Sequence, residues 1–156
     1  EKVKSIVAED ECVLGVYDLF LSSYGPERRV GSVHVEVPDI TTAEEIDELS
    51  RRVAERVFAR TDGQVIIAAV GIYSRNTSKD VASMRERVRR IVAAHDHVLQ
   101  FHGFHVDEAR HLLEFDVIIA FEAPDRQGEY HQIVREVEEA FPAYTVRATL
   151  DSDITD

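Results

Sequence analysis

The sequence is poor in basic side chains, in cysteine and in long apolar runs. Lysine and arginine number 18 against 30 aspartates and glutamates, so the formal net charge is −12. Contacts with nucleic-acid phosphates need a surplus of positive charge, and nucleic acid is therefore excluded as a partner. The single cysteine, Cys12, cannot form an internal disulfide and suits a reducing compartment. The longest apolar run, residues 65–73, is far short of the ~20 residues that cross a bilayer, and we expect this chain itself to be soluble.

What the chain does have is enough apolar material for a core. It contains 156 residues, of which 44% are hydrophobic, and this suffices for one ordinary domain or two small ones. The acidic surplus raises the local concentration of cations, which is compatible with metal binding. The first residue is Glu rather than Met, and the N-terminal residues do not read as a signal peptide. We therefore expect a piece of a longer protein.

One hairpin pattern occurs twice in the chain. In residues 13–38, Tyr24-Gly25-Pro26 predicts a turn. Valine alternates with polar residues over 32–37, which is the period of a half-buried strand. Residues 98–122 repeat this pattern in a shorter form, so the sequence predicts two related hairpins.

A helix precedes each hairpin, and a helix and a strand follow it. Apolar spacing predicts helices over 1–12, 41–61, 78–94 and 124–141, and β-branched stretches predict strands over 64–74 and 144–150. Thr41 and Glu44 have the spacing of a capping box, and Ser78 is expected to cap the third helix. The sequence thus predicts an α+β fold of two tandem αββαβ units, residues 1–75 and 76–156. Each unit should have a three-stranded sheet with helices on one face and the other face open.

The open face of the second unit is predicted to be polar. Strand alternation points one set of residues towards the helices, namely Leu99, Phe101, Phe115, Val117, Ile119, Val146, Ala148 and Leu150. It places a polar set on the open face, namely His102, Glu114, Asp116, Thr149 and Asp151. Imidazole nitrogen with carboxylate oxygens suits Zn²⁺, Mn²⁺ or Fe²⁺ better than a soft ion that needs thiolates. A solvated polar sheet face explains the same residues, and both interpretations stay open.

The open face of the first unit is predicted to be mostly apolar. The same alternation assigns to it Gly15, Tyr17, Leu19, Ile66, Ala68 and Val70, with Ser32, His34 and Glu36 as its polar members. An apolar sheet face needs cover, so we expect a subunit or inter-repeat interface there. In that setting His34 is either a hydrogen-bonded interface histidine or a metal ligand.

The first unit contains the segments VLGVYDL, SYGPERR and SVHVEVP, and the second contains FDVIIAFE and PAYTVRATLDSDITD. Together these segments resemble the cytoplasmic C-terminal region of the cation diffusion facilitator family of metal/proton antiporters. The resemblance covers nearly the whole chain, as a tandem version of a domain that the family usually has once. It implies a ferredoxin-like, metallochaperone-like αββαβ fold, dimerisation, and binding of zinc or a related divalent ion.

The resemblance also implies positions for metal ligands. The family's ligands are a His beside an Asp in the first strand, a His in the second, a His early in the next helix, and a His-x-Asp-Pro at the third strand. Carried over to this sequence, the candidates are His34, His102, Asp116, His131 and Asp151.

The first unit has lost most of this pattern. It has Tyr17 beside Asp18 and keeps His34, but has Glu45 near the helix position. Outside the pattern, His95 and His97 fall at a predicted helix C-terminus, where positive charge is favourable.

Taken together, the resemblance implies the regulatory and dimerising domain of a divalent-metal efflux transporter. Zinc is the first choice of ion, with manganese or iron as alternatives, and no organic cofactor is expected. The chain should form a homodimer and be linked to a transmembrane domain at the cytoplasmic face of the cell membrane.

The alternative is a soluble tandem sensor that binds a small molecule between the repeats. An enzyme is not expected, because no nucleophile, base and orienting residue occur together and there is no Gly-rich phosphate loop. Upstream apolar segments of ~20 residues carrying Asp and His would favour the transporter.

Overall fold

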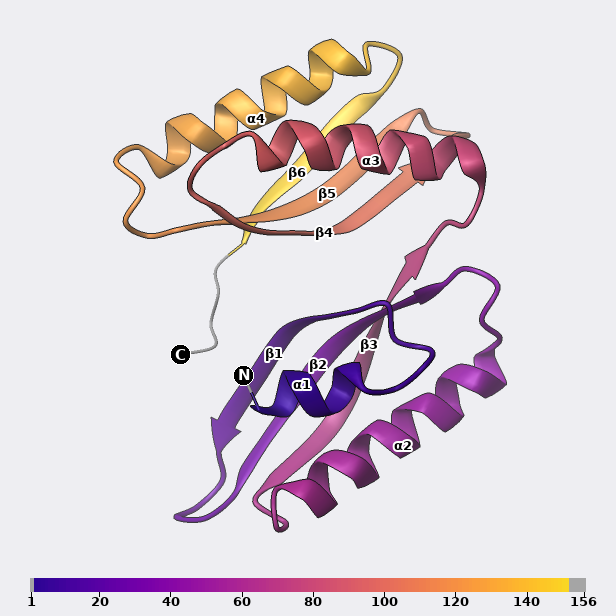
Figure 1. The fold of residues 1–156 in the computed structure, drawn as a ribbon, viewed down its shortest axis with the longest axis vertical. Coiled ribbons are helices and arrows are strands. Elements are labelled where there is room, and N and C mark those ends of the chain that lie inside the picture. Colours follow the sequence, from indigo (N-terminus) through magenta and orange to yellow (C-terminus); the bar gives the residue numbers. More distant parts are fainter. Residues whose placement is uncertain (1, 152–156) are drawn as a thin grey trace. The chain divides into compact units, whose positions relative to one another are not determined.

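The structure, a computed structural model, describes residues 2–151, so the end of the predicted second unit, residues 152–156, lies outside the described residues. The described chain divides between Arg75 and Asn76 into two compact units (Figure 1). Among the described helices, none has the length and apolar character needed to span a membrane.

The first unit has the order helix, strand, strand, helix, strand. Its elements are α1 (Lys2–Ala8), β1 (Gly15–Ser23), β2 (Arg29–Pro38), α2 (Ala43–Arg60) and β3 (Val65–Arg75). The sheet order is β1-β2-β3, in which β1 runs antiparallel and β3 parallel to the central strand.

The second unit repeats that order. Its elements are α3 (Lys79–Ala93), β4 (Val98–Asp107), β5 (Leu112–Ile119), α4 (Arg126–Ala140) and β6 (Thr145–Asp151). The sheet order is β4-β5-β6, again with one antiparallel and one parallel pair. The predicted α+β fold of two tandem ferredoxin-like αββαβ units is confirmed.

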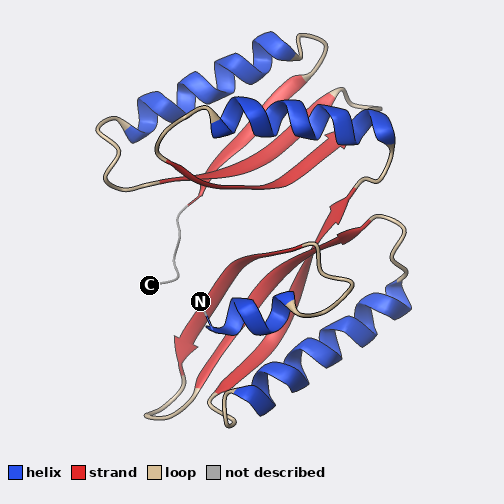
Figure 2. Cartoon of the chain, in the orientation of Figure 1, coloured by secondary structure: helices blue, strands red, loops and turns tan. Residues whose placement is uncertain are grey.

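In each unit the helices cover one side of the sheet (Figure 2). Buried valines of β2 pack with the apolar stripe of α2, which includes Leu49, Val53 and Val57. In the second unit, Phe115 and Val117 of β5 pack in the same way with α3 and α4. The core therefore takes one face of each sheet and leaves the other face outside the core.

The first strand of each unit contains a bulge at the same place. In β1 the register shifts between Tyr17 and Phe20, and Asp18 has a φ of 47°. In β4 it shifts between His102 and His105, and Gly103 has a φ of 63°. An inserted residue reverses the alternation beyond it, so side chains after the bulge change face.

These irregularities correct three of the face assignments predicted from alternation. Leu19, predicted on the open face, follows the bulge and is buried in the core. A shift between Gly31 and Ser32 in the β2–β3 pairing leaves an extra residue in β3, so Val70 packs against the core instead of lying open. Leu99 falls at a further irregularity in β4 and is 65% exposed instead of inward.

The start of α2 also lies one residue from its predicted place. The N-cap is Thr42, whose side chain accepts from the backbone N–H of Glu45, while the Glu45 carboxylate accepts from the Thr42 N–H. The capping box is therefore Thr42 and Glu45, not Thr41 and Glu44. Both pairs have the required three-residue spacing. The Thr41 N–H donates to the Pro38 carbonyl, so Thr41 belongs to the preceding turn and the helix cap falls on Thr42.

Candidate metal centre

The bulge in β4 fixes the face on which His102 lies. Immediately before the bulge, His102 is directly opposite Asp116 of β5. Directly opposed residues of an antiparallel pair point to the same face, and the neighbours Phe101 and Phe115 lie on the core face. His102 and Asp116 therefore project from the open face, as predicted.

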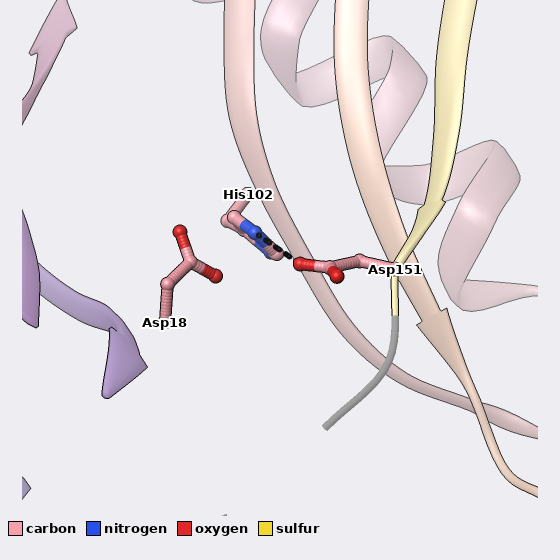
Figure 3. Close-up of side chains that lie close together, drawn as sticks. All are labelled: Asp18, His102 and Asp151. Atoms are coloured by element: carbon pink, nitrogen blue, oxygen red, sulfur yellow. Dashed lines mark ion pairs between the residues drawn. The ribbon is translucent and has the colours of Figure 1, made fainter. Parts of the chain in front are cut away.

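Asp151 completes the group from the third strand. It ends β6 and pairs with Ile118, two residues beyond Asp116, in the parallel register of β5 and β6. The His102 Nε2 atom lies 3.7 Å from Asp151 Oδ2 and 3.9 Å from Asp116 Oδ2. Figure 3 shows the His102 ring and the Asp151 carboxylate facing each other; Asp18, also drawn there, belongs to the first unit.

These distances suit ligands that share a metal ion. They are too long for N–H···O hydrogen bonds, which cluster near ~2.9 Å. Two ligands bonded at ~2.0–2.1 Å to tetrahedral Zn²⁺ are separated by about 3.4 Å. The separations at His102 exceed that value by only a few tenths of an ångström, which small side-chain rotations can close. One imidazole and two carboxylates are also a donor set that zinc, manganese and iron accept.

His131 is not brought to this group. It lies on α4 and is exposed, with its ring 5.3 Å from that of Tyr130. The Tyr130 hydroxyl donates to the Ala148 carbonyl of β6, and α4 covers the core face through Ile133. The sheet therefore separates His131 from His102, and a fourth ligand would have to come from elsewhere.

The first unit has different side chains at the equivalent positions. Tyr17 pairs with His34 just before the β1 bulge, as His102 pairs with Asp116 before the β4 bulge. Tyr73 pairs with Glu36, two residues beyond His34, and so occupies the place of an aspartate in the second unit.

In the first unit, the residues around the bulge form a hydrogen-bonded and stacked group. The Tyr73 hydroxyl donates to Asp18 Oδ2 at 2.7 Å, and the His34 and Tyr73 rings stack at 5.0 Å. His34 Nδ1 is 3.3 Å from the same Asp18 oxygen, although its direction is not that of a hydrogen bond. A Cβ on Gly71 would lie 2.1 Å from the His34 ring, which explains the glycine there. His34 thus lies in a tyrosine-rich setting, with one carboxylate beside it.

His95 and His97 have partners that the sequence did not indicate. His95 Nε2 lies 3.1 Å from Glu136 Oε2, and His97 Nδ1 lies 3.0 Å from Glu129 Oε2. Hydrogen bonds, first from Gln132 and then from His95, lower the pKa of Glu136. These pairs tie the α3–β4 connection to α4. Their carboxylates are 32 and 41 residues away in the chain, too far for a local pattern to reveal.

No protein-family model matches the chain, and no curated protein matches it. Among solved structures, the chain is similar to a mutant of MamM-CTD, with 16% sequence identity. The similarity covers 49% of this chain and 81% of that one, with a TM-score of 0.39. A similarity at this level assigns no family to the chain.

Proposed function

We propose that the chain is the regulatory domain of a divalent-metal efflux transporter of the cation diffusion facilitator type, and that its second unit binds the ion. The observation that carries the metal site is that His102 Nε2 of β4 lies 3.9 Å from the carboxylate of Asp116 on β5 and 3.7 Å from that of Asp151 on β6. The tandem αββαβ fold agrees with the sequence resemblance that suggested the family.

The donor atoms point to a borderline or hard divalent ion. One imidazole nitrogen and two carboxylate oxygens suit Zn²⁺ first, with Mn²⁺ or Fe²⁺ as alternatives. The role is binding and not catalysis, since the proposed ion would sit on the face of a sheet as a regulatory ligand. In this proposal the chain acts at the cytoplasmic face of the membrane, joined to a transmembrane domain, and assembles as a homodimer.

Calorimetric titration of the protein with Zn²⁺ and Mn²⁺ tests the metal site. The wild type should bind one ion per second unit, and His102→Ala should abolish that binding or weaken it by at least tenfold. The matched control is His105→Ala, which removes an exposed histidine of the same strand on the far side of the bulge. Affinity should also fall as the pH is lowered, because a protonated imidazole cannot ligate a metal.

Two results would count against the proposal. If the wild type binds neither ion, the chain has the fold without the metal function. If His102→Ala binds as tightly as the wild type while His105→Ala does not, the ion is held on the other side of the bulge.

A further inference from the structure

Arg126 joins the ends of the two strands that carry the carboxylates. It is the first residue of α4, and its Nε donates to the Ile119 carbonyl of β5 at 2.9 Å. Its Nη2 donates to the Asp151 carbonyl of β6 at 2.8 Å, and its guanidinium lies 4.7 Å from the centre of the Phe121 ring. One side chain thus holds the backbone of Asp151 against the neighbouring strand.

This position is an unusual one for an arginine. The N-terminus of a helix carries partial positive charge, so a basic side chain in the first turn is unfavourable there. The first unit has Ala43 at the same helix position, directly after the N-cap Thr42. The arginine occurs only in the unit whose third strand ends in a candidate ligand, and its two hydrogen bonds offset the unfavourable site.

Asp151 needs such support more than the other two candidates do. Asp116 lies within β5, the central strand, which is paired on both sides. Asp151 is the last residue of β6, an edge strand that pairs only with β5. Strand ends fray unless they are held, and a frayed Asp151 would carry its carboxylate away from His102.

We propose that Arg126 is a positioning residue of the metal site, which acts by fixing the backbone of Asp151 so that its carboxylate faces His102. This inference rests on the proposed metal-binding function. It assigns to α4 an indirect part in the site: the helix supplies no ligand but sets the place of one.

The direction in which metal affinity changes in an Arg126 variant distinguishes the positioning role from a simple effect of charge. A positive guanidinium near a cation repels it, so removal of the charge alone should tighten metal binding. Loss of a group that orients a ligand typically weakens metal affinity about 10–100-fold. Arg126→Met should therefore weaken Zn²⁺ binding by about tenfold, and Arg126→Lys, which keeps one donor group, should recover part of that loss.

The matched control is Arg147→Met. Arg147 lies on β6, the strand of Asp151, and is exposed, with its guanidinium 3.9 Å from Glu114. Its removal therefore deletes one positive charge near the site without freeing a strand end. It should leave affinity unchanged or slightly higher. In an Asp151→Asn background, Arg126→Met should cause no further loss, because the carboxylate through which it acts is gone.

Amide hydrogen exchange supplies a readout that needs no metal. In the metal-free protein, Arg126→Met should speed exchange at Leu150 and Asp151, while Arg147→Met should not. Unchanged exchange, unchanged or tighter Zn²⁺ binding in Arg126→Met, or an equal loss in Arg147→Met would each overturn the inference. A wild type that binds no ion overturns the proposed function itself, and with it the role of Arg126 in metal binding. A wild type that binds normally beside an unaffected Arg126→Met overturns the inference alone.

Discussion

At the scale of single residues, Asp10 is a buried charge that joins two helices of the first unit. It is buried just after α1 and its carboxylate accepts hydrogen bonds from Arg52 Nε at 3.1 Å and from Arg56 Nη2 at 3.4 Å on α2. The hydrogen bond from Arg52 is the main reason that the pKa of Asp10 is lowered, and burial acts in the opposite direction. The ion pair thereby fastens the short α1 to the long α2.

Asp10→Asn should destabilise the chain at neutral pH by about 2 kcal/mol, the usual size of a charge-assisted hydrogen bond in a partly buried setting. Because the folded-state pKa lies below the ordinary value near 3.9, the wild type's advantage is complete above about pH 4 and is lost as the pH falls through the folded-state pKa. Urea unfolding of both proteins over a series of pH values from 7 downwards measures this difference.

The control for that measurement is Asp47→Asn. Asp47 also pairs with an arginine, Arg51 at 2.9 Å, but both side chains are mostly exposed, and such pairs contribute little. A loss of stability in Asp47→Asn equal to that in Asp10→Asn would show that burial of the pair is not what matters. An Asp10→Asn effect that does not shrink as the pH is lowered would show that the carboxylate charge is not what matters.

Part of the candidate metal site could be predicted from individual residues of the sequence. Alternation along β5 and β6 was enough to place Asp116 and Asp151 on the open face, and the family resemblance singled out His102. His131 does not lie with the other candidates, because spacing along a helix does not say which side of a sheet the helix covers. Arg126 was missed, although a basic residue directly after an N-cap is a local anomaly that could have drawn attention to it.

At the scale of elements, caps and bulges decide where each helix begins and which way each strand residue faces. The Thr42 hydroxyl accepts from the Glu45 N–H at 3.3 Å, and the reciprocal bond from the Thr42 N–H to the Glu45 carboxylate is 2.7 Å. Thr42→Ala removes the first of these bonds and should lower stability by about 1 kcal/mol.

Thr41→Ala is the matched control for the cap, because Thr41 has the same side chain one residue earlier and lies outside the box. Thermal unfolding followed by circular dichroism compares the two variants. If Thr41→Ala is the more destabilising, the helix begins where the sequence alone suggested.

Element order and type followed from the sequence, but side-chain facing after each irregularity did not. Periodicity located each hairpin and the apolar stripe of α2 because burial of Leu49 and Val53 leaves a clear pattern. Alternation assigns faces by counting residues, however, and each bulge adds one residue to the strand. When the added residue is an aspartate such as Asp18, the local composition does not reveal the bulge. Two predicted members of the apolar face of the first unit, Leu19 and Val70, pack against the core for this reason, while Phe20, just after the bulge, is 49% exposed and pairs with Ser32.

At the scale of the whole molecule, the homodimer is a proposal that rests on the family resemblance and on the apolar side chains predicted for the open face of the first unit. Two copies each carry a net charge of −12, so they repel one another, and salt screens that repulsion. Sedimentation equilibrium should give about twice the chain mass, with association that strengthens from about 20 mM to about 300 mM salt as the screening length shortens. A single-chain mass at every protein and salt concentration would remove the homodimer from the proposal.

The shared register of the two sheets also bears on how such a chain can change over time. The core of each unit is filled by buried valines and other apolar side chains on one face of its sheet. The side chains on the other face lie outside that core, and the first strand of each unit has a left-handed residue at its bulge. Tyr17, His34 and Tyr73 hold the paired positions that His102, Asp116 and Asp151 hold in the second unit. Three substitutions, Tyr17→His, His34→Asp and Tyr73→Asp, would therefore give the first unit the same three side chains at those positions.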